Sequence, residues 1–443
     1  MIELVFAGSD LDQLRKRLLG SEHEQCAVLF TNAVSRGNTI VRVLVTGQEF
    51  PGEQDYLRQT GNEAQLNPEF VARVTKTALR NQHGLVFVHT HPGKGVPEFS
   101  IVDDQGEVHL ADFMSRRGSR ATNGALVLAE VGCAARILGT NEPLRVVEVG
   151  VRRQVVYPSS DDSEVSQVFD RQVRAFGAAG QRALQTLHVG VVGLGGTGSV
   201  VVQQLVHLGV GTFTLVDPDV VEATNLNRLA NAAPEDIGTD KVEVAARYIR
   251  TVAPSTRVVL LKGDVIRTRI ARQLANVDIL LCCTDSHGSR AVLQQLAYQY
   301  LIPCIDVGTV IAAQSGRVTH IYGRVQLLSP GLPCLTCSKL LDANEVRRDM
   351  MTAFERQADP YLRGAREPAP AVMSLNSVVS SLAAGMVLGL ATDAPFATGY
   401  LLFNAMTGTV RRAQSESEPD CHICSKTGAL ARGDSWPLLA RQD

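Results

Sequence analysis

A glycine-rich turn between an apolar strand and a helix places the strongest constraint on how this chain can fold. The run His188-Val-Gly-Val-Val192 leads into Gly193-Leu-Gly-Gly-Thr-Gly198, and residues 199–208 follow with a helical pattern. Glycines let the backbone pass close to phosphate oxygens, while the start of the helix offers free N–H groups and a partial positive charge. The turn predicts a nucleotide site, although nicotinamide and flavin enzymes share this pattern.

Strand-like and helical patterns alternate along the rest of this region. The expected strands cover residues 189–192, 213–216, 257–261, 279–283 and 304–307, and the expected helices cover residues 199–208, 241–252 and 290–300. Alternation at this spacing is typical of a doubly wound, mostly parallel sheet. The predicted fold class is therefore α/β, with a Rossmann-like domain in this part of the chain.

The amino-terminal third has a different texture and predicts a separate, mixed α/β domain. Short apolar runs alternate there with helical patterns such as residues 68–80, and the polar stretch 157–164 that follows has no periodicity. The charged segment 342–370 predicts a mobile loop or crossover at the active site. The predicted organisation is a first domain over residues 1–151, a linker over 152–165, a nucleotide-binding domain over 166–425 and a tail over 426–443.

Charge and hydropathy exclude two classes of partner. Lys and Arg number 43 and Asp and Glu 45, so a net charge of −2 gives no polyelectrolyte attraction to nucleic acid or anionic lipid. Residues 371–391 are about long enough to span a membrane, but serines and an asparagine interrupt them and favour a buried helix. The first residues lack the apolar block of a secretory signal, so we expect a cytoplasmic protein without nucleic-acid or membrane partners.

A candidate metal site follows an apolar run in the first domain. His89-Thr-His91-Pro ends that run, and Asp103 comes at the start of the next expected helix. Side chains two apart at a strand end point the same way, so the two imidazoles can hold one ion and Asp103 can add a carboxylate oxygen. Three protein ligands leave a fourth position for water, the arrangement of a catalytic zinc ion. The pattern predicts hydrolysis of an amide-like bond.

Such a site needs a carboxylate that accepts the proton of water and delivers it to the leaving amine. Glu24, which stands just before Cys26-Ala27 and an apolar run, is the best-placed candidate. Glu22 is the nearby alternative, but it lacks the Glu-x-Cys context.

Together these residues resemble the JAB/MPN (JAMM) metalloprotease family, in which a glutamate precedes Cys-Gly and is followed by H-x-H-P and S-x-x-D. The resemblance covers about residues 1–150. It implies that His89, His91 and Asp103 are zinc ligands, that Glu24 is the general base and that Ser100 stabilises the oxyanion. Ala27 replaces the usual glycine, and one more residue than usual separates His91 from Ser100. That residue either fits into the loop at 93–95 or displaces Asp103. The alternative is a JAB fold that has lost its metal and serves as a scaffold.

Charged residues downstream of the glycine turn distinguish an ATP-dependent enzyme from an oxidoreductase. Asp217, about twenty residues beyond the turn, can hold a ribose hydroxyl. Arg228 and Lys241 provide the positive charge needed by an enzyme that attacks the α-phosphate of ATP and releases pyrophosphate. Asp285, at the end of an apolar strand, supplies a carboxylate suited to magnesium. The predicted cofactors of this domain are ATP and Mg²⁺.

With Phe169-Asp-Arg171-Gln172 ahead of the first strand, this set closely resembles the ThiF/MoeB and ubiquitin-activating-enzyme family over about residues 166–425. The resemblance implies that Asp217 holds the ribose and Asp285 the magnesium ion. Arg171 matches a residue that reaches into the neighbouring subunit's ATP site, which implies a homodimer. Leu229 departs from the glutamine that often follows the arginine. The residues implied around the phosphates are Gly193, Gly195, Gly196, Gly198, Asn225, Arg228 and Lys241.

Four of the nine cysteines form two C-x-x-C pairs, Cys334 with Cys337 and Cys421 with Cys424. Four thiolates in two such pairs make a closed tetrahedral zinc site, and the pairing is similar to the structural zinc of the ThiF family. We therefore expect two zinc ions per chain, one catalytic and one structural.

Other cysteines bear on the acceptor of the activated group. Many activating enzymes form a thioester on a cysteine in the crossover, yet the sequence has none between Ser338 and Asp420. Cys282, Cys283 and Cys304 lie in apolar runs typical of core residues. The sequence therefore predicts a MoeB-type adenylyltransferase that hands its product to another protein's nucleophile.

The two resemblances together imply a zinc peptidase fused to an ATP-dependent activator of a ubiquitin-like protein's carboxyl terminus. Such fusions resemble bacterial ubiquitin-like operons, some of them associated with defence against phage. One domain would trim a precursor or cleave conjugates, and the other would adenylate the terminal carboxylate, with a conjugating enzyme as a further partner. Two alternatives stay open: an activator of a sulfur-carrier protein for cofactor or cysteine biosynthesis, and a non-catalytic JAB domain that docks the small protein.

Overall fold

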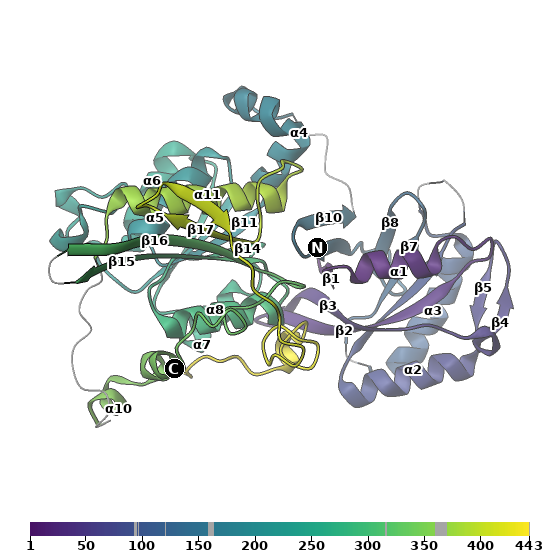
Figure 1. Cartoon of the computed structure of the whole chain (residues 1–443). Helices are drawn as coiled ribbons and strands as arrows, with labels where there is room; N and C mark the ends of the chain where they lie inside the picture. The colour runs from purple at the N-terminus through teal and green to yellow at the C-terminus, as the bar shows by residue number, and fades with distance from the viewer. Residues whose placement is uncertain are drawn as a thin grey trace. The chain divides into compact units, whose positions relative to one another are not determined.

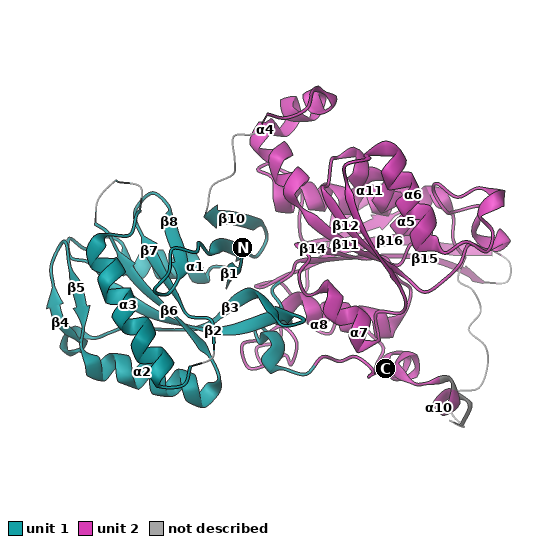
Figure 2. Cartoon of the chain, turned by 180° about the vertical axis from the view of Figure 1, so that it is seen from behind, with its two compact units in different colours: residues 1–159, 299–301, 429–437 teal, residues 160–298, 302–428, 438–443 magenta. Residues whose placement is uncertain are grey.

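The computed structural model describes residues 1–92, 95, 97–119, 121–157, 164–314, 317–358 and 370–442, which form two compact α/β units (Figure 2). Unit 1 consists of Met1–Ser159, Gln299–Leu301 and Ala429–Pro437. Unit 2 consists of Ser160–Tyr298, Ile302–Gly428 and Leu438–Asp443.

Unit 1 is built on an eight-stranded sheet of order β10-β9-β1-β3-β2-β6-β7-β8, beside a small β4-β5 hairpin. Its strands are β1 (Glu3–Ala7), β2 (Cys26–Arg36), β3 (Thr39–Glu49), β4 (Tyr56–Gln59), β5 (Ala64–Leu66), β6 (Gly84–Thr90), β7 (Gly124–Leu128), β8 (Cys133–Ile137), β9 (Arg145–Val149) and β10 (Arg153–Tyr157). Its helices are α1 (Asp10–Leu18), α2 (Pro68–Asn81) and α3 (Ile101–Arg116), with short 3₁₀ turns at Glu53–Asp55 and Gly433–Ser435.

The pleat of β6 decides which side chains reach α3. Val86 and Val88 pack in the cluster that contains the apolar residues of α1, whereas Leu85 and Phe87 pack with α2 and α3. Successive strand residues point to opposite faces, so His89 lies on the α3 side with Leu85 and Phe87. The start of α3 and the end of β6 therefore face the same space.

Two segments of unit 1 differ from the predicted linker and tail. Arg153–Tyr157, placed in the linker from the sequence, forms β10 and pairs antiparallel with β9. Ala429–Pro437 belongs to unit 1 instead of a free tail, and the Asn32 side chain donates to Ala431 O at 2.9 Å. The first segment is a short edge strand paired with its neighbour in the chain, whereas the second contacts residues almost four hundred positions away, so local periodicity carries little signal for either. Residues 158–163, the centre of the predicted linker, lie outside the described residues.

A buried ion-pair network surrounds Glu3 in unit 1. Its carboxylate lies 2.8 Å from Arg42 Nε and 3.1 Å from Arg153 Nη2. Burial alone would raise the pKa of Glu3, but Arg42 and Arg153 outweigh it and lower the pKa to about 2. The carboxylate thus stays charged inside the fold.

We expect Glu3→Gln to destabilise the chain by about 3 to 5 kcal/mol at pH 7, because it leaves buried guanidinium groups without their carboxylate. A carboxyl group with a lowered pKa stabilises the fold above its ordinary value of 4.5 and loses this effect as pH falls toward 2. The difference in the free energy of unfolding between wild type and variant should therefore decrease as pH drops below 4.5. Denaturant unfolding at several pH values measures this difference, with Glu130→Gln, at an exposed position, as control. A difference independent of pH would contradict the assignment of a charged Glu3 carboxylate.

Unit 2 is built on an eight-stranded sheet of order β13-β12-β11-β14-β15-β16-β17-β18. Its strands are β11 (His188–Val192), β12 (Thr212–Asp217), β13 (Arg257–Lys262), β14 (Ile279–Cys282), β15 (Cys304–Gln314), β16 (Arg317–Leu328), β17 (Tyr400–Asn404) and β18 (Thr409–Arg412). Its helices are α4 (Asp170–Thr186), α5 (Gly196–His207), α6 (Lys241–Val252), α7 (Thr268–Ala271), α8 (His287–Gln299), α9 (Ala343–Met350), α10 (Ala353–Ala358) and α11 (Met373–Ala391).

The strand order of unit 2 defines a binding edge. Strands β11 to β15 pair in parallel, and chain order reverses between β11 and β14, which are neighbours. Helices α5, α6 and α11 cover one face and α7 and α8 the other (Figure 1). Open α/β sheets bind ligands outside the carboxyl ends of the strands at such a switch point. The glycine turn follows β11 and Asp285 follows β14, so both stand at this point.

The far half of the sheet is antiparallel, which the sequence did not predict. β15 runs on to Gln314, well beyond the expected strand at 304–307, and pairs with β16 over its whole length. Residues at the distal end of this hairpin are partly exposed, so they do not form the continuous apolar run of a buried parallel strand.

Helix α11 is the one described helix whose length and apolar composition are compatible with crossing a membrane. It contacts α5, β15 and β16, and Val379, Ala383 and Val387 lie in the core of unit 2. As predicted, it is a buried core helix.

Candidate functional site

The imidazoles of His89 and His91 and the carboxylate of Asp103 meet in unit 1. His89 Nε2 lies 3.1 Å from His91 Nε2 and 3.2 Å from Asp103 Oδ1, and His91 Nε2 lies 3.6 Å from Asp103 Oδ2. Nitrogen and oxygen ligands in a tetrahedral zinc site are roughly 3.3 Å apart, so this donor set fits one zinc ion. The extra residue before Ser100 has not displaced Asp103; residues 93 and 94 of that loop lie outside the described residues.

The first turn of α3 fixes the orientation of Asp103. Ser100 N–H donates to Asp103 Oδ2 at 2.6 Å, and Asp103 N–H donates to Ser100 Oγ at 3.2 Å. This reciprocal capping leaves Asp103 Oδ1 toward His89. Burial would raise the pKa of Asp103, but hydrogen bonds with His89 and His91 hold it well below its usual range. The Ser100 hydroxyl accepts the Asp103 N–H through a lone pair, so its own proton can still be donated to another acceptor.

Glu24 stands beside the histidines. Its Oε1 lies 4.0 Å from His91 Nε2, and the residue is only 8% exposed. Its backbone is held by the β4-β5 hairpin, because Glu24 N–H donates to Thr60 O and Gln59 Nε2 donates to Glu24 O. Burial raises the pKa of Glu24, which brings it closer to that of an effective general base at neutral pH. Glu22, the alternative, is exposed.

The glycine turn of unit 2 is packed so closely that two of its positions accept only glycine. Gly193 has φ +86°, and a side chain there would also meet Cys283 O at the end of β14. A Cβ at Gly198 would overlap Gly193 O. At Gly195, by contrast, a Cβ would meet nothing within 4 Å. The turn therefore packs against the protein at Gly193 and Gly198, whereas space remains beside Gly195, just before the N-terminus of α5.

Charged side chains gather around this turn. Buried Asp217 ends β12 and accepts from Leu194 N–H at 2.6 Å, while burial raises its pKa and Lys241 opposes this rise. Lys241 Nζ lies 2.7 Å from Asp219 Oδ2 and 3.9 Å from Asp217 Oδ1. The structure therefore brings Asp217 and Lys241 together at the carboxyl edge.

Arg228 and Asn225 lie on the connection that follows β12. Asn225 is buried, and its side chain accepts from Glu222 N–H at 3.0 Å, which shapes this connection. Arg228 donates to Thr224 O at 2.8 Å, and its Cδ lies 3.5 Å from the position that a Cβ of Gly196 would take. Arg228 therefore flanks the glycine turn, whereas the Asn225 side chain binds the backbone N–H of Glu222.

Asp285 is exposed beyond the end of β14, and Arg290 binds the backbone next to it. Arg290 Nη2 donates to Thr284 O at 2.8 Å and to Val307 O at 3.1 Å. The Asp285 side chain is exposed, beyond the end of the strand that pairs with β11, which leads into the glycine turn.

The four cysteines of the C-x-x-C pairs converge in unit 2. Their sulfur atoms lie within 4.8 Å of one another, with 3.6 Å between Cys334 and Cys421 and between Cys337 and Cys424. Thiolates at about 2.3 Å from a tetrahedral zinc ion are roughly 3.8 Å apart, so the set fits zinc and is too widely spaced for disulfides. A hydrogen bond from Cys334 lowers the pKa of Cys424.

The remaining cysteines of unit 2 are core residues, as predicted. Cys282, Cys283 and Cys304 are buried in or beside β14 and β15. Burial raises the pKa of Cys283 to about 12 and that of the other two well above the ordinary value. None of these three is therefore poised as a thiolate nucleophile.

A family model described as the ThiF family matches residues 169–423, which is more than half of the chain and most of unit 2. The chain belongs to the ThiF family. Unit 2 accordingly carries a ThiF/MoeB-type adenylyltransferase domain.

Relatives of known activity align with the same part of the chain. The SAMP-activating enzyme E1 of Haloferax volcanii is 28% identical over 254 residues, 57% of this chain and 85% of that protein. The molybdopterin-synthase adenylyltransferase of Escherichia coli is 27% identical over 263 residues, 58% of this chain and 96% of that protein. The crystal structure of E. coli MccB with MccA-N7isoASN covers 59% of this chain and 76% of its own, with 19% identity and a TM-score of 0.48.

Polar residues of the ThiF domain that sequence reasoning missed lie beside the predicted ones. Asn376, buried in α11, occupies the space that a Cβ of Gly196 would need. Asp306 is fully buried between Arg290 and Arg324, at 3.6 Å from Arg290 Nε and 2.5 Å from Arg324 Nη1. Each of these two residues is a polar residue inside an apolar run of the sequence, and that pattern could have indicated a buried polar contact at Asn376 and Asp306.

The predicted crossover is partly helical. Its described residues form α9 and α10, and Asp349 of α9 accepts from Ser286 Oγ at 2.8 Å and from Gly288 N–H at 3.0 Å. This contact ties α9 to the start of α8, next to Asp285. Residues 359–369, also within the predicted loop, lie outside the described residues.

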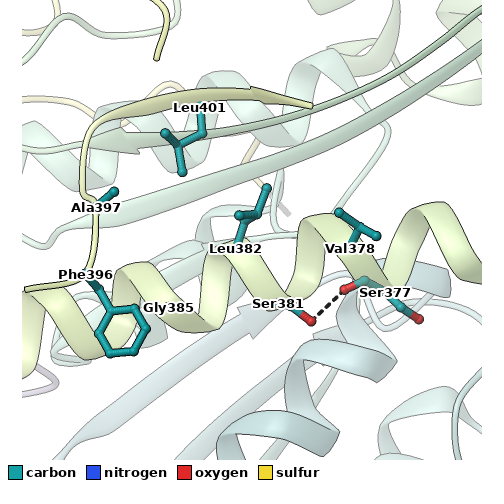
Figure 3. A pocket seen from close by; sticks show the side chains of 8 residues that line it. All are labelled: Ser377, Val378, Ser381, Leu382, Gly385, Phe396, Ala397 and Leu401. Carbon is teal, nitrogen blue, oxygen red and sulfur yellow. Dashed lines mark hydrogen bonds between the residues drawn. The ribbon is translucent and has the colours of Figure 1, made fainter. Parts of the chain in front are cut away.

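An apolar cavity of about 500 Å³ lies along α11, and none of the predicted ligands lines it (Figure 3). Its lining residues are Ser377, Val378, Ser381, Leu382, Gly385, Phe396, Ala397 and Leu401. This lining offers two serine hydroxyls and no charged group, so the cavity is unsuited to a triphosphate.

Proposed function

We propose that the ThiF domain adenylates the carboxyl terminus of a ubiquitin-like or sulfur-carrier protein. The observation that carries the proposal is the glycine turn and Asp285 on the two strands of one switch point, with Arg228 beside the turn. A carboxylate oxygen attacks the α-phosphorus of ATP, and the bond to pyrophosphate breaks. Positive charge from Arg228 and Lys241 stabilises the phosphoryl oxygens, and Asp285 would hold a magnesium ion, which would neutralise further charge on the phosphates.

The absence of a cysteine between Ser338 and Asp420 in the sequence supports transfer to a nucleophile on another protein. The similarity to a molybdopterin-synthase adenylyltransferase favours a sulfur-carrier partner, and the similarity to a SAMP-activating enzyme favours a protein modifier. Exchange of labelled pyrophosphate into ATP, dependent on the small protein that copurifies with the tagged chain, tests the proposal. Intact mass identifies that protein, and its gene context separates the two partners: a neighbouring conjugating enzyme marks a protein modifier, and neighbouring sulfurtransferases mark a sulfur carrier.

We further propose that unit 1 is a JAB-like zinc peptidase that processes the same partner or its conjugates. The convergence of His89, His91 and Asp103, with Glu24 beside them, supports it. His89, His91 and Asp103 would hold a zinc ion, which when bound would make a water molecule more acidic and polarise the scissile carbonyl. Glu24 accepts the water's proton and passes it to the leaving amine, and Ser100 donates to the oxyanion. In the alternative, unit 1 only docks the partner.

The homodimer and the cytoplasmic location stay predictions. Arg171 is exposed on α4, as a residue that reaches another subunit must be. Measurement of mass in solution checks the dimer directly.

We expect two zinc ions per chain with different roles. Cys337→Ser should lower the melting temperature, because the Cys334, Cys337, Cys421 and Cys424 site joins segments more than eighty residues apart. His89→Ala should release one zinc ion with little change in melting temperature. Elemental analysis and calorimetry of both variants measure this. A single zinc ion per chain, unchanged in His89→Ala, would show that unit 1 is a scaffold.

A further inference from the structure

The guanidinium group of Arg136 is buried against the first two turns of α3. Arg136 lies on β8; its Nε is 3.0 Å from Glu107 Oε2, and its Nη2 is 2.8 Å from both Glu107 Oε1 and Asp104 Oδ1. The side chains of Arg136 and Glu107 are each 9% exposed. A two-pronged, buried guanidinium–carboxylate pair has a fixed geometry that a point charge does not impose. It therefore fixes α3 to the sheet.

The same guanidinium also contacts the segment that precedes α3. Its Cζ lies 3.8 Å from the centre of the Phe99 ring, and that ring meets His89 edge-on, with centroids 6.3 Å apart. Arg136 thus contacts Phe99 on one side and Asp104 on the other, and these two residues bracket Ser100 to Asp103.

We infer that Arg136 is a positioning residue for the proposed zinc site: it holds Asp103 at ligand distance from His89 and His91. This rests on the proposed function of unit 1. Within α3, the capping contacts with Ser100 fix how Asp103 is turned, but they move with the helix. Met114, near the far end of α3, contacts Thr75 of α2, whereas the Arg136–Glu107 pair joins α3 to the sheet one helical turn from Asp103. Because zinc tolerates deviations of only a few tenths of an ångström, a small shift of α3 weakens the carboxylate ligand.

Arg136→Lys tests the inference, because lysine retains the charge and loses the two-pronged geometry. The matched control is Arg116→Lys, which alters an exposed arginine paired with Asp112 on the same helix. Zinc affinity of the full chain is measured by competition with a chromophoric chelator while the four-cysteine site stays filled. The absorption of Co²⁺ at the histidine site is obtained by subtracting the spectrum of the His89→Ala chain.

We expect Arg136→Lys to bind Zn²⁺ and Co²⁺ about ten- to hundredfold more weakly, with a changed Co²⁺ spectrum, and Arg116→Lys to match wild type. If Arg136→Lys lowers the melting temperature of the zinc-free chain, the double variant Arg136→Met with Glu107→Leu removes the pair without an unpaired buried charge and should show the same loss of affinity. Wild-type affinity and spectrum in these variants would overturn the inference about Arg136 and leave the proposed zinc site unaffected. Failure of wild type to bind metal at His89 would overturn the proposed zinc site and the inference with it.

Discussion

Asp285→Ala should strongly reduce partner-dependent exchange of pyrophosphate into ATP while the melting temperature stays that of wild type. Asp285 is exposed beyond β14, and the neighbouring backbone is held by Arg290 and not by the Asp285 side chain. The substitution therefore removes charge that is needed only around magnesium and the phosphates. Loss of one such contact costs about two to four kcal/mol of transition-state stabilisation, or roughly thirty- to thousandfold in rate.

Arg228→Ala should give a loss of the same order, because Arg228 flanks the glycine turn from the connection after β12. The matched control is Arg250→Ala, which removes an exposed arginine from α6. Exchange and calorimetry are run on the same preparations. Exchange at the wild-type rate in both Asp285→Ala and Arg228→Ala would refute the adenylation assignment, whereas a loss in Arg250→Ala would indicate a general effect of charge.

The parts of both sites that sequence reasoning found are those fixed by short stretches of chain. His89 and His91 share a face because they are two apart at the end of β6, and Asp103 orients through a turn that begins at Ser100. The glycine turn joins one strand to the next helix, and Gly193 needs its positive φ whatever lies far away in sequence. Local geometry therefore predicted these groups without knowledge of the tertiary fold.

Most of the parts that were missed depend on pairing between distant segments. Arg136 and Glu107 are 29 residues apart, and neither stands in a pattern that marks it as buried. The β15–β16 hairpin is local, but its distal end mixes exposed and half-buried residues, so a parallel-sheet expectation ended the first strand too early. Ala429–Pro437 joins unit 1 through contacts with residues almost four hundred positions away, such as Asn32. No periodicity within such segments reports the partner that buries them.

Glu24→Gln should separate the two activities of the chain: zinc content and adenylation persist, and cleavage of a partner extended beyond its terminal glycine is lost. Glu24 Oε1 lies 4.0 Å from His91 Nε2, outside the set of donor atoms that fits zinc, so its amide analogue leaves the ligands intact. An amide has no proton affinity comparable with that of a carboxylate. General acid–base assistance is worth on the order of a hundred- to ten-thousandfold, so the defect should be large.

The substrate for this assay is the copurifying small protein with a short extension at its carboxyl terminus, and cleavage is read by intact mass beside pyrophosphate exchange. Glu22→Gln is the control, because this neighbour is exposed and carries the same charge. Loss of cleavage in Glu22→Gln and not in Glu24→Gln would move the base to Glu22. Absence of cleavage by wild type with zinc bound would favour the docking role of unit 1, because the ligands His89, His91 and Asp103 would then hold a metal ion without a working base. Loss of both activities in Glu24→Gln would instead contradict the assignment of two separate catalytic sites, since no contact of Glu24 in unit 1 gives it a part in binding ATP.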